Sequence, residues 1–100
     1  MTTAPGDPLA RLRAAMDAIN DRLVAVLQER AALCRQIARW KQSQGLPLAD
    51  AGRETAMLAA LVAQCGDQSA GEGFAPAALE RILRAVLAES RALVLAHGRG

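Results

Sequence analysis

The stretch that decides the fold runs from residue 8 to residue 43 and reads PLARLRAAMDAINDRLVAVLQERAALCRQIARWKQS. Apolar residues recur in it at alternating intervals of four and three, the pattern of one long amphipathic helix. The members of this apolar seam are Leu12, Met16, Ile19, Leu23, Val26, Leu33, Ile37 and Trp40. At ~1.5 Å per residue the helix is about 50 Å long. Unless the rest of the chain folds back along it, sharing it with a second protomer is the simpler way to bury the seam.

Arg30 interrupts the apolar seam between Val26 and Leu33. A guanidinium cannot lose its charge in a protein, and burying that charge unpaired is expensive. We therefore expect an anionic group beside Arg30. That group is either a carboxylate from another helix, in a buried ion pair, or a bound anionic molecule, and position alone does not separate the two.

Composition indicates one small helical domain that spans residues 1–100. The chain is 52% hydrophobic, and its only aromatic residues are Trp40 and Phe74. A chain of this size buries a modest core alone, so oligomerisation is an expected source of further stability. A net charge of +2, with no basic patch interleaved with aromatic residues, argues against a nucleic-acid partner.

Targeting and redox signals are equally plain. No apolar run approaches the length of a membrane span, and residues 1–7 contain no hydrophobic signal region. Cys34 and Cys65 form no metal-ligand pattern and are interpreted as free thiols in a reducing compartment. We expect a cytoplasmic protein without membrane contact.

Capping signals divide the rest of the chain. Asp7-Pro8 suits a helix start, while Gly45 and Pro47 end the long helix. Asp50 is a plausible cap for a second helix and Pro76 opens a third. The predicted architecture is all-α, one long helix plus two shorter helices, at about residues 8–43, 50–64 and 76–96. The intervening stretch 66–73 is predicted to be a loop, and residues 97–100 to fray.

Polar residues break the apolar faces of these helices. Ser90 lies on the inward face of the third helix, where it either bonds the carbonyl one turn back or holds a ligand. Glu54 lies beside the apolar face of the second helix, where its plain interpretation is a solvated first-turn carboxylate. Four other candidate residues also have simple structural interpretations. Asp50 can be a cap and Arg53 a surface cation, and Arg13 and Lys41 can be ordinary snorkelling side chains.

Helix geometry relates three of the cations. Arg30 and Lys41 are eleven residues apart, which is roughly 16 Å along one face, so their long side chains can clamp a small molecule. Arg13 lies about 25 Å before Arg30 and cannot share that ligand from the same helix. It can do so from an antiparallel helix of a second subunit, in a symmetric dimer.

Several short motifs follow one another at a specific spacing. They are Leu12–Asn20 (LRAAMDAIN), Gln28–Leu33 (QERAAL), Trp40-Lys41, Gly45–Glu54 (GLPLADAGRE) and Glu89-Ser90. Each is weak alone, but their combination and order over residues 9–95 resemble the all-helical, type II chorismate mutases. The resemblance implies an intertwined homodimer that rearranges chorismate to prephenate, in phenylalanine and tyrosine biosynthesis, with no cofactor or metal.

The resemblance also implies roles for the cations that match the family's motifs. Arg13 would reach into the partner's site and bind a substrate carboxylate. Arg30 would bind a carboxylate within its own subunit's site, and Arg53 would add a cation near the side-chain carboxylate. Lys41 would contact the ether oxygen and a carboxylate. Because negative charge grows on the ether oxygen as its bond breaks, a donor already in place there stabilises the transition state more than the ground state.

The remaining matched residues would hold the ring. Asp50, partly through its backbone, and Glu54 would hold the ring hydroxyl, and Ser90 the ring carboxylate. Val94 stands where the family usually has Gln or Glu as a second donor to the ether oxygen. Loss of one such donor typically slows a reaction by ~10²–10³-fold. Either the enzyme is slow, another group such as His97 substitutes, or the substrate differs.

Other functions are therefore kept open. Isochorismate-pyruvate lyases and aminodeoxychorismate mutases resemble this family and use much the same cations. A catalytically degenerate helical dimer that binds or regulates a partner enzyme is an alternative of another class. A purely structural coiled coil fits less well, because Arg30 would cost stability at its seam.

Overall fold

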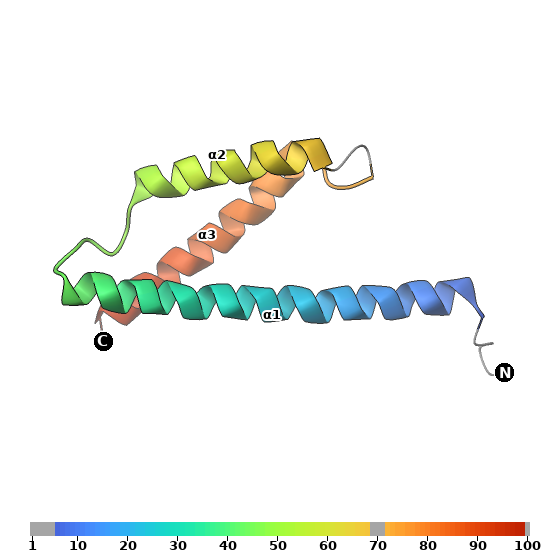
Figure 1. The fold of residues 1–100 in the computed structure, drawn as a ribbon, viewed down its shortest axis with the longest axis horizontal. Helices are drawn as coiled ribbons and strands as arrows, with labels where there is room; N and C mark the ends of the chain where they lie inside the picture. Colours follow the sequence, from blue (N-terminus) through green and yellow to red (C-terminus); the bar gives the residue numbers. More distant parts are fainter. Residues whose placement is uncertain (1–5, 69–71, 100) are drawn as a thin grey trace. The chain divides into compact units, whose positions relative to one another are not determined.

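The computed structural model describes residues 6–68 and 72–99, and within them the side chains of residues 6–64 and 72–96. Three helices make up the described chain, which contains no strand (Figure 1). Their bounds are Pro8–Ser43 for α1, Ala51–Gln68 for α2 and Pro76–Arg99 for α3. The predicted all-α architecture, with one long helix and two shorter ones, is confirmed.

The start of α1 is set by an aspartate cap. Asp7 Oδ1 accepts a hydrogen bond from the Leu9 N–H at 3.1 Å, and the Asp7 carbonyl accepts the first helical bond, from Arg11, at 3.1 Å. Pro8 occupies the first helical position, where the absence of an N–H leaves no bond unmade.

The end of α1 is set by Gly45. Its φ is 69°, in the left-handed region that glycine adopts without a steric penalty. The Leu46 N–H then donates to the Lys41 carbonyl at 2.8 Å, and the Gly45 N–H to the Gln42 carbonyl at 3.2 Å. This pair of bonds is the Schellman motif, which satisfies the last carbonyls of a helix and stops it.

The two shorter helices both extend beyond their predicted ends. α2 continues to Gln68 instead of stopping at residue 64, so part of the predicted 66–73 loop is helical. One glycine inside a helix costs about 1 kcal/mol relative to alanine, which is too little to end an established helix at Gly66. α3 likewise includes residues 97–99, which were expected to fray, because each residue added to an existing helix gains a backbone hydrogen bond.

Little of the described chain is buried. α2 and α3 pack against each other, and the Leu58 side chain between them is only 7% exposed. Ala38, near the end of α1, is the other buried side chain among those described. The core of a single chain is therefore small.

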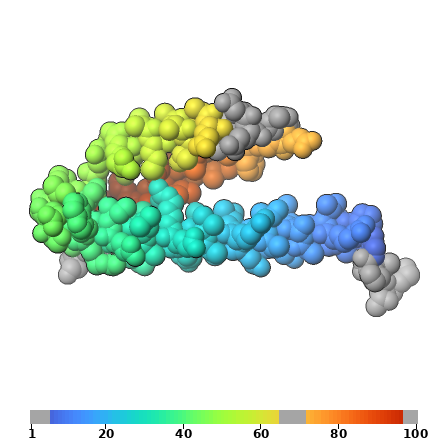
Figure 2. Space-filling model, in the orientation of Figure 1, coloured from blue at the N-terminus to red at the C-terminus, as the bar shows by residue number. Residues whose placement is uncertain are grey.

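The chain consists of two units, residues 1–33 and residues 34–100. The first contains most of α1, and the second contains its last turns with α2 and α3. Figure 2 shows the side chains of residues 8–33 standing out along their helix, from blue to cyan. Every member of the apolar seam is exposed, from 46% at Ile37 to 67% at Leu12. The seam predicted to be buried is thus unburied in one chain.

Candidate active site

Lys41 lies in the last turn of α1. Its side chain is half-buried, and its carbonyl accepts the Schellman hydrogen bond from the Leu46 N–H at 2.8 Å. A cation is favoured here because it faces the negative end of the helix dipole. The cap built on Gly45 therefore fixes the backbone from which the Lys41 ammonium extends.

The first turn of α2 brings together three predicted site residues. Asp50 Oδ1 accepts the Arg53 N–H at 3.0 Å, and the Asp50 carbonyl accepts the Glu54 N–H at 3.1 Å. Asp50 is therefore the N-cap of α2, which agrees with its plain interpretation. A carboxylate has about four acceptor positions, so this cap leaves Asp50 able to accept a ligand's hydrogen bond as well. The Arg53 side chain is exposed beside it.

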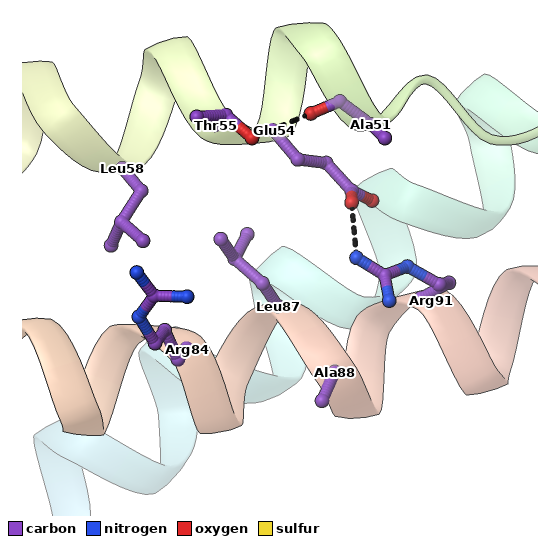
Figure 3. Close-up of a pocket in the computed structure, with 8 residues that line it drawn as sticks. All are labelled: Ala51, Glu54, Thr55, Leu58, Arg84, Leu87, Ala88 and Arg91. Carbon is purple, nitrogen blue, oxygen red and sulfur yellow. Dashed lines mark hydrogen bonds and ion pairs between the residues drawn. The ribbon is translucent and has the colours of Figure 1, made fainter.

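Glu54 is not a solvated carboxylate. Its side chain is only 23% exposed, and its Oε2 lies 2.5 Å from Nη2 of Arg91 on α3 (Figure 3). The two residues are 37 positions apart in the chain. The hydrogen bond to Glu54 is the main cause, and the carboxylate's charge the second, of a raised pKa of the Arg91 guanidinium. The ion pair therefore links α2 to α3 directly.

An open groove of about 230 Å³ runs beside this ion pair, between α2 and α3. Figure 3 shows Leu58 and Leu87 on its apolar part and Arg84 at the other end from Arg91. Arg84 is bound within its own helix, where Nη2 lies 2.6 Å from Glu80 Oε1. The other residues that line the groove are Ala51, Glu54, Thr55 and Ala88.

Ser90 and Val94 lie one turn apart on α3, and both are half-buried. The Ser90 hydroxyl donates to the Val86 carbonyl at 2.7 Å, which is its plain interpretation, while its oxygen can in addition accept a bond. Val94 carries no polar group. The side chain of His97, the predicted substitute, lies outside the described residues.

A comparison with known protein families identifies the family of this chain. A family model described as chorismate mutase type II matches residues 12–94. The chain belongs to this family. Comparison with the curated proteins and with the solved structures gives no match. The matched stretch includes every site residue predicted from the sequence, from Arg13 to Val94.

The predicted site residues of this chorismate mutase family member occur in both units of the chain. Arg13, which is exposed, and Arg30, which is half-buried, lie in the unit of residues 1–33. The other predicted site residues lie in the unit of residues 34–100, and they are Lys41, Asp50, Arg53, Glu54, Ser90 and Val94. Within the second unit, the cap of α2 holds Asp50, Arg53 and Glu54 on one turn.

Arg91 is the residue beside the site that sequence reasoning missed. It lies one turn after Leu87, at the edge of the apolar face of α3, where arginine normally exposes its charge. The sequence did contain one signal of such a partner, which was Glu54. When another helix covers the edge of an apolar face, a carboxylate at that edge loses water and needs a cation beside it.

Two further predictions concern cysteines and membranes. The Cys34 side chain is half-buried on α1, while the side chain of Cys65 lies outside the described residues. In the part of the chain that the structure describes, none of the helices combines the length and the apolar character that crossing a membrane requires.

Proposed function

We propose that this member of the chorismate mutase family catalyses the rearrangement of chorismate to prephenate. The observation that carries the proposal is the family match over residues 12–94, in which the predicted cations and ring-binding residues all occur. No group in the proposed mechanism acts as a nucleophile, because the reaction is pericyclic.

The proposed chemistry is positioning followed by electrostatic stabilisation. Chorismate is a dianion, and its enolpyruvyl arm must fold over the ring before the bonds exchange. Arg30, Arg53 and Arg13 of the partner subunit bind the two carboxylates and hold this folded conformer, which removes much of the entropic barrier. Lys41 donates to the ether oxygen, where negative charge develops.

The ring end of the substrate is assigned to the first turn of α2. Asp50, partly through its backbone, and Glu54 hold the ring hydroxyl, and the Glu54 carboxylate accepts its proton. Glu54 is suited to this because Arg91 occupies only one position, on Oε2, and the carboxylate retains others. Ser90 contributes to holding the ring carboxylate: because a carboxylate only accepts hydrogen bonds, the Ser90 proton turns to it from the Val86 carbonyl, its acceptor without substrate.

A homodimer is part of the proposal. Arg13 and Arg30 are separated by about 25 Å of the continuous helix α1, so one small ligand cannot bridge them within a chain. The exposed apolar seam supports the same conclusion, because monomeric proteins rarely leave so long an apolar stripe in water. An antiparallel second copy would cover the seam and bring its Arg13 to Arg30.

The test of activity follows the absorbance of chorismate mixed with the purified protein, and identifies prephenate by its acid conversion to phenylpyruvate. Isochorismate and 4-amino-4-deoxychorismate are assayed in parallel, because pyruvate release distinguishes a lyase from a mutase. Turnover of chorismate to prephenate is expected. Failure of the protein to exceed the uncatalysed rate would refute the proposal.

Subunit mixing tests the shared site. Arg13→Ala and Lys41→Ala are each expected to be inactive as pure proteins. Random reassociation makes half of the dimers mixed, and each mixed dimer has one complete site, so about one quarter of wild-type activity should return. A mixture as inactive as its components would show that Arg13 does not act across the interface.

A further inference from the structure

The Glu54–Arg91 ion pair places a counter-ion on the carboxylate that is proposed to hold the ring hydroxyl. Glu54 is held at its backbone, where its N–H donates to the Asp50 carbonyl at 3.1 Å, and at its carboxylate, where Arg91 lies 2.5 Å away. The Glu54 side chain is 23% exposed and that of Arg91 48%. The carboxylate is oriented toward α3, where the more exposed Arg91 side chain meets it (Figure 3).

An ionised carboxylate accepts hydrogen bonds and cannot donate them. Its ligand must therefore present a donor at this point. Two ring substituents of otherwise similar substrates meet that demand: the neutral hydroxyl of chorismate and the protonated amine of 4-amino-4-deoxychorismate. A carboxylate without a counter-ion favours the ammonium, because the charge-assisted bond is the stronger one.

Glu54 has a counter-ion. Arg91 offsets its charge through the contact with Oε2, and a cation bound to the other carboxylate oxygen would lie near the guanidinium. A ring ammonium would then gain little from Glu54 and would be repelled by Arg91, whereas a hydroxyl would still find an acceptor.

We propose that Arg91 is a positioning residue that makes this site select substrates with a ring hydroxyl over substrates with a ring ammonium, acting through Glu54. The inference rests on the proposed function, in which Glu54 holds the ring substituent. In this proposal Arg91 acts through its contact with Glu54 and not through contact with the reacting bonds. It sets the net charge and the orientation of the acceptor that does.

The chain offers a matched control in Arg84. This second arginine lines the same groove, but its guanidinium lies 2.6 Å from Glu80 and pairs within α3. Replacing either arginine by methionine removes one positive charge from the groove and keeps an unbranched side chain. Only the Arg91 substitution leaves Glu54 without its partner.

The experiment measures kcat/KM for chorismate and for 4-amino-4-deoxychorismate with the wild-type protein and with Arg91→Met, Arg91→Lys, Arg84→Met and Glu54→Gln. Circular dichroism confirms the helix content of each. The wild type should prefer chorismate. In Arg91→Met the preference should fall about tenfold, as expected for loss of one like charge near the ligand at partial exposure, chiefly through a lower KM for the amino substrate.

The other variants make the result specific. Arg91→Lys should retain most of the preference for chorismate, and Arg84→Met should leave that preference unchanged. Glu54→Gln should increase it, because the neutral amide no longer attracts an ammonium. An unchanged preference in Arg91→Met, or an equal fall in Arg84→Met, overturns the inference while the proposed function stands. Absence of turnover with both compounds refutes the proposed function and the inference with it.

Discussion

Leu23→Ala tests whether a second copy of the chain covers the apolar seam. Leu23 lies in the middle of the seam and is 54% exposed in one chain. Complete burial of a leucine side chain is worth roughly 1.5–3 kcal/mol, so covering its exposed half contributes about 1–1.5 kcal/mol. A symmetric dimer contains the residue twice.

The substitution should therefore weaken the dimer by about 2–3 kcal/mol, since most of the leucine side chain is removed in both copies. That is roughly a 30- to 150-fold increase in the dimer Kd. Sedimentation equilibrium over a range of protein concentrations measures this Kd, and circular dichroism checks that helix content is retained. Activity at low protein concentration should fall together with the dimer fraction.

Val24→Ala is the matched control. Val24 is 57% exposed, about as much as Leu23, but it lies ~100° around the helix and outside the apolar seam. Its replacement should leave the Kd within about twofold of the wild-type value. A wild-type chain that stays monomeric, or an equal effect of both substitutions, would refute the assignment of the seam as a dimer interface.

Three further substitutions test the helix end and the site. Gly45→Ala should lower the free energy of unfolding by about 1–2 kcal/mol, because a φ of 69° strains any residue with a Cβ. Urea unfolding measures this free energy, and the control Gly6→Ala should leave it unchanged. Val94→Gln should raise kcat by up to about 10²-fold by restoring a donor to the ether oxygen, and an unchanged rate would mean that the site already has its second donor. Arg30→Ala should lower kcat/KM by about 10²-fold or more while the helical dimer persists, whereas unfolding would assign Arg30 to a structural ion pair.

Local signals explain how much of the fold could be predicted. The cap at Asp7 and the left-handed Gly45 each act within a few residues, so both ends of α1 could be located from the sequence. The end of α2 could not, because Gly66 weakens a helix without ending it, and nothing local separates a weak helical turn from a loop. The same local signals placed Lys41 near the end of one helix and Asp50 at the cap of the next.

What the sequence by itself determined is the set of helices, the apolar seam and the family's cations, because periodicity, caps and motif spacing are properties of neighbouring residues. Only the tertiary structure decided that Glu54 is paired, since its partner Arg91 is 37 positions away and meets it only when α2 packs on α3. The electrostatic environment of the Glu54 carboxylate is therefore a property of the packed helices. No local pattern encodes it, because an ion pair depends on distance in space.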